Sequence, residues 1–334
     1  MTKTKPAGSN TLLRLLPGLL VTAAAVAGLF YFIDMDQLGP ALRIADFTWF
    51  PLVLLIFLGT LTTRTFAWRT ILQERASFKD CFLVLNQAYL LNNVLPFRLG
   101  ELGRAVLISD RARMGFWEAL STVVVERVFD LGLAAAMLLF TLPLVVGADW
   151  ARTAAYVSLG LVVIGFALLF WMASNPKKVP ALIERLTGRW PKLREWLVDK
   201  AGAFTQGLSA LRDGKRFLRV LFWMVLTWLT NVGWYFVLMR AFFPMAEWLW
   251  GFFTVAVSSL GVALPSSPGY IGVFEGVLVG ALSLFNADPA VALAFAVVGH
   301  VTYFVVTGII GIIGFWQQGE SLGGIYRKLL NRQA

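Results

Sequence analysis

The chain has 334 residues, of which 58% are hydrophobic, 14% aromatic and 14% charged. A soluble globular domain carries about 25% charged residues, so this composition excludes an ordinary soluble enzyme. One crossing of a bilayer needs about 20 apolar residues, and apolar sequence extends from residue 12 to residue 317. We therefore expect a single integral-membrane domain, 1–334, with no separate catalytic domain.

Six stretches are long and apolar enough to be full membrane spans, at about 12–33, 50–72, 118–142, 152–173, 217–242 and 289–317. Two further apolar stretches, 80–109 and 248–285, contain Pro, Gly and polar residues in their middles. A continuous transmembrane helix rarely tolerates such breaks. We interpret both as re-entrant hairpins or broken helices, so the expected fold is all-α.

The positions of Lys and Arg predict the orientation. If the N-terminus is cytoplasmic and both broken segments return to the side they came from, the cytoplasmic side holds 25 of the 29 basic residues. This satisfies the positive-inside rule and explains the net charge of +10 without nucleic acid. We expect a multi-pass protein of the cytoplasmic (inner) membrane with both termini in the cytoplasm. Its longest loop, 174–219, forms either amphipathic interfacial helices or a solvated linker.

The two broken segments share a pattern. Leu95-Pro96 and Leu264-Pro265 are each followed within about ten residues by glycine and glutamate, and a long span then follows. In the expected topology the first unit, about 50–142, presents its hairpin from the cytoplasm, whereas the second, about 217–317, presents it from outside. This predicts an inverted repeat, which many transporters use to build a site at the midplane. The alternative is two unrelated breaks in a structural bundle.

The first break brings polar residues to membrane depth. They are Asn92, Asn93, Arg98, Glu101 and Arg104. On a helix that begins near Pro96, the last three share one face. Free N–H groups at a helix start and arginine guanidinium groups both suit a lipid phosphate. Alternatively, the charges pair with one another and only stabilise the hairpin tip.

A second cluster, Glu126, Arg127 and Asp130, lies inside the expected span 118–142. Each ionised side chain at a helix centre costs about 2.5–3.5 kcal/mol on insertion scales, so these residues need partners or water. They form either the wall of a hydrated headgroup cavity or a buried pair network. Glu126 and Asp130 are also candidates for proton coupling.

The second break contains Ser266, Ser267, Gly269 and Glu275 among prolines and glycines. Backbone groups freed there must line a cavity or be buried in protein, and a tight structural turn is the alternative. His300, the only histidine, is a third candidate for proton coupling, although a lone histidine on an apolar helix is more often a satisfied interhelical hydrogen bond.

Arg64 and Arg69, with Trp68, lie at the cytoplasmic end of the span 50–72, where snorkelling anchors are expected. One histidine and one cysteine do not assemble a usual zinc site, and the chain contains no P-loop, dinucleotide fingerprint or nucleophile elbow. We therefore expect no metal, no cofactor and no catalytic residue.

Three ordered motifs, Asn92 to Arg104, Glu126 to Asp130 and Pro265 to Glu275, resemble the lysylphosphatidylglycerol synthase transmembrane family, whose members are also called flippase-like domain proteins. The resemblance covers about 50–317. It implies a polytopic helical domain that handles lipids with charged or glycosylated headgroups, in some relatives polyprenyl-phosphate sugars.

These observations predict a lipid flippase or transporter, and not an enzyme, for a phospholipid or a lipid-linked sugar phosphate. Arginines and hairpin N–H groups would hold the phosphate, while the carboxylates would meet cationic or hydroxylated headgroup parts or protons. The alternatives are a membrane-embedded glycosyl or acyl transferase and a non-transporting partner subunit of a lipid-modifying enzyme. The oligomeric state is left open. The candidate substrate-binding residues are Asn92, Asn93, Arg98, Glu101, Arg104, Glu126, Arg127, Asp130, Ser266, Ser267, Gly269 and Glu275.

Overall fold

The computed structural model describes Ala27 and residues 35–95, 98–145, 149–187, 191–262 and 268–320. Within these ranges all regular secondary structure is helical, which confirms the predicted all-α class for this part of the chain. Apart from Ala27, the expected first span, 12–33, lies outside the described residues, as do Ser266 and Ser267 of the second break.

The helices follow one another along the chain, with two broken segments between the long ones. In order they are η1 (Met35–Gln37), α2 (Leu38–Arg43), η2 (Phe47–Trp49), α3 (Phe50–Ile71), α4 (Phe78–Val94), α5 (Leu99–Arg111), α6 (Phe116–Val145), α7 (Asp149–Ser174), α8 (Lys178–Leu186), α9 (Pro191–Gly207), η3 (Leu208–Leu211), α10 (Gly214–Phe242), α11 (Trp248–Gly261), η4 (Pro268–Tyr270), α12 (Val273–Ser283) and α13 (Pro289–Gln318).

Four of the six expected spans qualify as membrane-spanning helices by themselves, and the expected span 12–33 lies outside the described residues. Among the described residues, α6, α10, α13 and α3 together with η2 are long and apolar enough to cross a bilayer. The end of α7, Leu159–Ser174, meets this criterion only together with α8, from which it is bent by 104°. The described part of the chain therefore has four candidate spans, or five with the bent pair.

Local sequence signals explain where several helices begin. The Ser77 hydroxyl accepts a hydrogen bond from the backbone N–H of Asp80 at the start of α4, and the Asp213 carboxylate accepts from two N–H groups at the start of α10. Asp288 caps α13 in the same way, and Pro289 follows at a position where a helix needs no N–H donor. The long apolar helices thus start at residues that can be identified in the sequence.

The first broken segment is an antiparallel pair of helices. Helix α4 ends at Val94, before Pro96, because proline disfavours helical conformation in the residue that precedes it. The Arg111 side chain at the end of α5 lies 3.8 Å from the Asp80 carboxylate at the start of α4. Gly100 allows the close approach, since a Cβ there would lie 2.1 Å from the Ala88 carbonyl oxygen.

The second broken segment has the same form. The rings of Trp250 near the start of α11 and Phe285 after α12 stack at 4.7 Å, so the outer ends of the two helices lie together. Near the break, a Cβ on Gly261 would lie 2.6 Å from a methyl group of Val277. Both segments that the sequence marked as broken are therefore helical hairpins.

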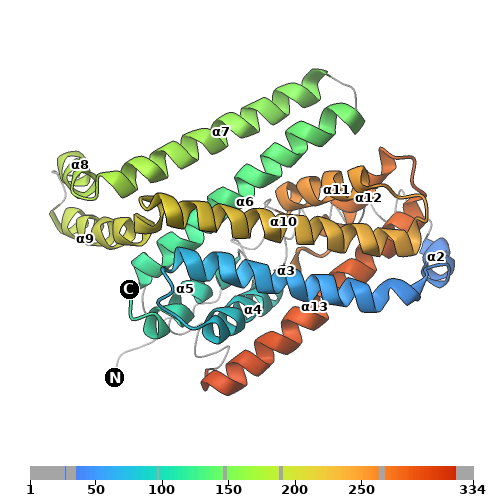
Figure 1. Ribbon diagram of the computed structural model, residues 1–334, viewed down its shortest axis with the longest axis horizontal. Helices are drawn as coiled ribbons and strands as arrows, with labels where there is room; N and C mark the ends of the chain where they lie inside the picture. The colour runs from blue at the N-terminus through green and yellow to red at the C-terminus, as the bar shows by residue number, and fades with distance from the viewer. Residues whose placement is uncertain are drawn as a thin grey trace, which may run out of the picture.

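The long helices pack across the two halves of the chain. Helices α3 and α10 lie side by side and run in opposite directions (Figure 1). Arg219 and Glu74 pair at 2.9 Å at one end of this couple, and the Asp46 N–H donates to the Ala241 carbonyl at the other. Helix α4 packs on α13, and α11 packs on α6. The two hairpins are thereby brought to the centre of the bundle.

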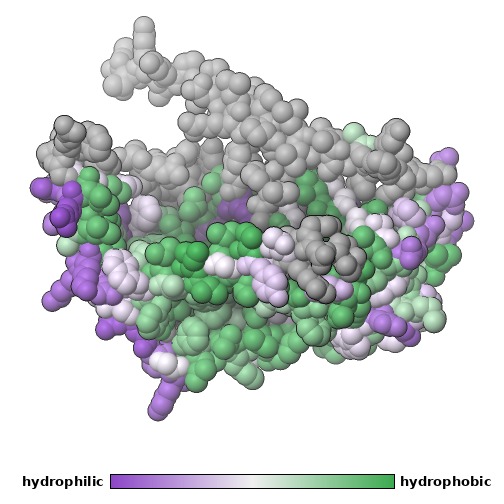
Figure 2. Space-filling view, turned by 90° about the horizontal axis from the view of Figure 1, so that it is seen from above, coloured by the Kyte–Doolittle hydropathy of each residue, from purple (hydrophilic) through white to green (hydrophobic). Residues whose placement is uncertain are grey.

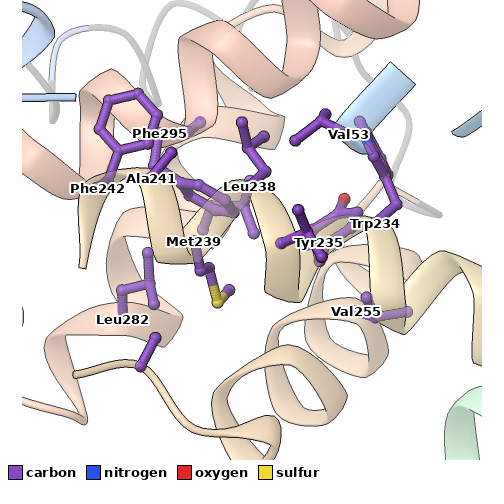
Figure 3. Close-up of a cluster of buried hydrophobic side chains, with 14 of the residues drawn as sticks. Val53, Trp234, Tyr235, Leu238, Met239, Ala241, Phe242, Val255, Leu282 and Phe295 are labelled. Carbon is purple, nitrogen blue, oxygen red and sulfur yellow. The ribbon is translucent and has the colours of Figure 1, made fainter. Parts of the chain in front are cut away.

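The hydrophobic core lies around the second half of α10. Trp234, Tyr235 and Leu238 are buried there between α3, α11 and α13, and the Phe295 ring of α13 packs against the rings of Tyr235 and Phe242 (Figure 3). On the face shown in Figure 2, hydrophobic residues fill the middle of the long axis, and hydrophilic residues gather towards its two ends. This distribution suits a helical bundle whose middle lies in the apolar part of a bilayer.

Candidate functional site

A cavity of about 440 Å³ lies where the two hairpin breaks meet α3, α6, α10 and α13. Its charged lining consists of Arg64, Arg98, Arg127, Glu101 and Asp130, so guanidinium groups outnumber carboxylates by three to two. Aromatic and small polar residues complete the wall, among them Tyr89, Trp228, Trp234, Tyr270, Tyr303, Thr60, Thr227, Asn231 and Ser259. Apolar residues such as Leu61, Leu131 and Val262 form much of the remaining wall, so the cavity carries a small excess of positive charge in largely apolar surroundings.

Glu126 lies beneath the cavity at the centre of an ion-pair network. It is completely buried, and its two carboxylate oxygens accept hydrogen bonds from the Arg104 guanidinium at 2.9 and 2.6 Å. Arg64 and Arg127 donate to the same carboxylate at 2.8 and 3.1 Å. The Arg104 guanidinium also lies 3.6 Å from the centre of the Trp68 ring, which favours a cation over its face. Arg104 and Glu126 therefore connect α5 to α6 and do not line the cavity.

Asp130, one turn further along α6, faces the cavity. Arg64 binds both of its oxygens, with one contact at 3.0 Å, and Arg127 lies 3.2 Å away. The indole N–H of Trp228 donates to the same carboxylate at 3.1 Å. Bidentate arginine–carboxylate pairs of this kind are geometrically specific, so Asp130 holds Arg64 in a fixed orientation at the cavity wall.

The expected ladder of Arg98, Glu101 and Arg104 is paired within itself only through one long contact, between Arg98 and Glu101. Helix α5 begins at Leu99, and Arg98 stands just before it in the left-handed conformation with φ of 53°. Arg98 and Glu101 are 3.9 Å apart, whereas the Glu101 carboxylate lies 3.5 Å from Arg127 on α6. Glu101 and Arg104 thus both pair with α6, whereas Arg98 points to the second break.

Arg98 connects the two breaks. Its guanidinium donates to the Val262 carbonyl at the end of α11 at 2.5 Å, and it lies 5.4 Å from the centre of the Tyr270 ring. Gly269, with φ of 70°, packs against the Phe304 ring and the Asn93 carbonyl. The two hairpin tips are therefore in direct contact at the cavity.

The two asparagines at the end of α4 have different environments. The Asn92 side-chain oxygen accepts a hydrogen bond from the Gly100 N–H at 2.8 Å, and so supplies a partner to a free donor at the start of α5. The Asn93 side-chain oxygen is buried without a hydrogen-bond partner among the described residues. Neither residue belongs to the cavity lining.

Glu275 and His300 form a second, separate pair. The Glu275 carboxylate accepts from the Gly272 N–H at 2.7 Å, and its other oxygen lies 2.5 Å from the His300 Nδ1. The imidazole stands between the rings of Phe274 and Phe304 and lines the cavity. His300 thus makes an interhelical hydrogen bond from α13 to α12, and Glu275 stands behind it.

The interpretation of Arg64 as a membrane-interface anchor is wrong. Its side chain is only 13% exposed and pairs with two acidic residues of α6, while Trp68 is completely buried. The position of Arg64 near the end of an apolar span suggested snorkelling. Its acidic partners, Glu126 and Asp130, lie more than 60 residues further along the chain and were not apparent from the sequence. Asn231, a polar residue inside the span 217–242, is a cavity residue that the sequence signalled and that we overlooked.

Carboxylates are the groups in the cavity that suit a metal ion, and arginines already occupy them. In the ranges that the structure describes, no three His, Cys, Asp or Glu side chains come together in a way that could hold one. The arrangement can instead accept an anionic group, because the positive charges of the lining exceed the negative ones.

The fold and the site define a helical, multi-pass membrane protein with a charged cavity between two broken helices. A comparison with protein families identifies the class more closely: residues 15–311 match the lysylphosphatidylglycerol synthase TM region. The chain belongs to this family, as the resemblance of its motifs indicated.

Individual relatives are more distant. A glycosyltransferase named AglD from Haloferax volcanii is 29% identical over 89% of this chain, which spans about half (53%) of that relative's length. A UPF0104 membrane protein from Methanothermobacter thermautotrophicus is 25% identical over 77% of this chain and 80% of the relative. Another from Methanocaldococcus jannaschii is 26% identical over 68% of this chain and 93% of the relative.

One of these relatives corrects an expectation. The sequence analysis expected that the chain is not an enzyme, because its sequence shows no donor site or nucleophile motif. A relative that aligns with 89% of the chain is named a glycosyltransferase, so that exclusion is wrong. Motifs of soluble enzymes give no signal for catalysis at a membrane-embedded cavity, where charged residues are spread over several helices.

Proposed function

We propose that the central cavity binds the phosphate-bearing headgroup of a phospholipid or a lipid-linked sugar phosphate, and that the protein moves this headgroup across the membrane. The observation that carries the proposal is a cavity with Arg64, Arg98 and Arg127 on its wall, enclosed by apolar helices. A guanidinium group binds phosphate through two parallel hydrogen bonds. The acyl or prenyl chains would stay in the bilayer.

Arg98 is the arginine best placed to meet the phosphate. Arg64 is held by Asp130 and Glu126, and Arg127 by three carboxylates, whereas Arg98 has one carboxylate at the long distance of 3.9 Å. Its nearest acceptor is a neutral backbone carbonyl. A phosphate is a stronger acceptor than a carbonyl because it carries a negative charge and can accept two parallel hydrogen bonds from one guanidinium group, so it would compete for Arg98.

We propose that the two halves form an inverted repeat around this cavity, with both hairpins re-entering from opposite sides. Three features support it. The equivalent helices α3 and α10 run in opposite directions, as do α6 and α13 (Figure 1). Each hairpin's first helix packs on the long helix of the other half. Basic residues on α8, α9 and the start of α10 favour a cytoplasmic position for that end of the bundle and contact of its amphipathic helices with the membrane surface.

The test is binding and translocation of defined lipid probes. The purified protein would be placed in liposomes with fluorescent phosphatidylglycerol or a fluorescent polyprenyl phosphate, and loss of fluorescence to an external reductant would report movement. Arg98→Ala should weaken probe binding about 10- to 100-fold, since a hydrogen bond to a charged group contributes about 1.5–3 kcal/mol. Arg219→Ala is the matched control, because it removes an arginine near the start of α10, away from the cavity lining. Equal binding in both variants would overturn the proposal.

A membrane-embedded transferase is the second candidate, favoured by the relative that is named a glycosyltransferase. The same cavity would then hold the lipid phosphate while a group is transferred to or from it. Incubation with a radiolabelled polyprenyl-phosphate sugar and an acceptor lipid distinguishes the two, because a transferase forms a new labelled product and a transporter only moves the label between leaflets.

Three residues remain candidates for proton coupling. Both oxygens of Glu126 are engaged by guanidinium groups, and Asp130 has Arg64, Arg127 and Trp228 as partners. His300 has one carboxylate partner and borders the cavity directly. Of the three, His300 is the residue whose ion-pair partner among the described residues is not an arginine.

A further inference from the structure

The second helices of the two hairpins begin in the same way. Arg98 precedes α5 with φ of 53°, and Gly272 precedes α12 with φ of 81°, so both helices are entered through positive φ. In each helix the third residue is a glutamate, Glu101 or Glu275, which provides an acidic group in the first turn. The first turns of α5 and α12 are therefore equivalent at these positions.

Each of these glutamates contacts the long helix that follows its own hairpin. Helices α6 and α13 are both 30 residues long. Glu101 lies 3.5 Å from Arg127, which is 11 residues after Phe116, the first residue of α6. Glu275 lies 2.5 Å from His300, which is 11 residues after Pro289, the first residue of α13. His300 thus occupies in the second half the position that Arg127 occupies in the first.

We propose that Glu275 and His300 form the second copy of a latch that Glu101 and Arg127 form in the first half, and that protonation of the histidine controls only the second latch. The inference rests on the proposed function in that each latch would hold one hairpin tip against its long helix during transport. The difference between the two copies is chemical: arginine keeps its charge at all physiological pH values, whereas histidine changes charge between about pH 5 and 8.

Protonation would strengthen the second latch and couple it to the ligand. A charged imidazole paired with a carboxylate is held more strongly than a neutral one. His300 also shares the cavity with charged and titratable groups from α3, α4, α5, α6, α10, α13 and both breaks, namely Arg64, Tyr89, Arg98, Glu101, Arg127, Asp130, Tyr235, Tyr270 and Tyr303. An anionic headgroup placed among them would stabilise the protonated histidine, so a phosphate and a proton would each favour binding of the other.

The latch can be tested without any transported lipid. Ser259 of α11 lines the cavity, and Cys81 is the only native cysteine and is completely buried. In a Cys81→Ala background, Ser259→Cys would be labelled in nanodiscs with a water-soluble maleimide at pH values from 5.5 to 8, with rates corrected for the thiolate fraction on a glutathione standard. We expect labelling to be about five-fold slower at the acidic end, because a stronger latch would open less often and admit the reagent less often. The difference in free energy between a charged and a neutral hydrogen bond corresponds to about this factor in an equilibrium constant.

Two substitutions of His300 mimic the protonated and the neutral form of the latch. His300→Arg supplies a permanent charge, as in the first half, and should give slow labelling at every pH. His300→Gln keeps a polar side chain without a charge and should give fast labelling at every pH, and Glu275→Gln should do the same if the arginine variant does not fold. A pH-independent rate in the parent protein, or a pH-dependent rate that survives in the glutamine variants, would overturn the inference. Failure of the lipid translocation assay alone would refute the proposed function and leave this result intact.

Discussion

Removing the carboxylate of Glu126 is expected to be the most damaging single change in the charged network. Glu126→Gln keeps the size of the side chain but leaves Arg104 without an acidic partner among the described residues, because Arg64 still pairs with Asp130, and Arg127 with Asp130 and Glu101. Breaking a buried ion pair from one side costs about 3–5 kcal/mol, since a desolvated charge remains. The equilibrium constant for unfolding should then change by two to nearly four orders of magnitude.

The matched control is Glu74→Gln. Glu74 pairs with Arg219 at a similar distance of 2.9 Å, but the arginine side chain is 57% exposed. Exposed pairs contribute about 0–1 kcal/mol because water screens them. A second comparison is the double variant Glu126→Gln with Arg104→Met, which removes the unpaired charge and keeps an apolar contact with the Trp68 ring. It should recover part of the loss.

The measurement is reversible unfolding in mixed micelles with increasing dodecyl sulfate, followed by tryptophan fluorescence. The chain has 13 tryptophans, and Trp68 and Trp228 lie in contact with the network itself. If Glu126→Gln unfolded within about 1 kcal/mol of the Glu74 variant, the carboxylate would not be holding a desolvated cation. The network would then be solvated, and the assignment of Arg104 and Glu126 to a buried connection between α5 and α6 would be refuted.

Three further outcomes can be checked. Gly100→Ala should destabilise the protein by about 1–3 kcal/mol because its Cβ meets the Ala88 carbonyl, whereas Gly59→Ala, with open space around it, should be neutral or stabilising in the same unfolding assay. Arg127→His should make binding of the fluorescent phosphate lipid more strongly pH-dependent than in the parent protein, where His300 alone is proposed to change charge. The affinity should be highest below about pH 6 and should fall as the introduced imidazole loses its charge at higher pH. Cys81 should react with a maleimide only after unfolding, since its side chain is fully buried.

The all-helical fold and its two interruptions followed from the sequence for a local reason. Apolar composition and span length are set by the bilayer, and proline and glycine in the middle of an apolar stretch end a helix wherever the chain folds. The breaks near Pro96 and Pro265 were therefore predictable, and both segments form hairpins. The number of spans is matched in part: four expected spans qualify by themselves, and the end of α7, Leu159–Ser174, qualifies together with the bent helix α8.

The charged cluster on α6 was also visible in the sequence, since Glu126, Arg127 and Asp130 are too costly to face lipid. The sequence showed that this cluster needs partners, but it did not show which residues they are. Arg64 lies 62 residues before Glu126 and was assigned to the membrane interface, and the carbonyl that Arg98 binds is 164 residues away.

The sequence by itself determined which side chains cannot be exposed to lipid and where the helices must break, because hydrophobicity and backbone propensity act over a few residues. Only the tertiary structure decided which charges meet. The packing of α3 and α5 on α6, and the contact of the first break with the end of α11, set those pairings. The correspondence of Arg127 with His300 is also decided by the tertiary structure. The two residues lie at the same position along α6 and α13, but they are equivalent because each contacts the glutamate of its own hairpin.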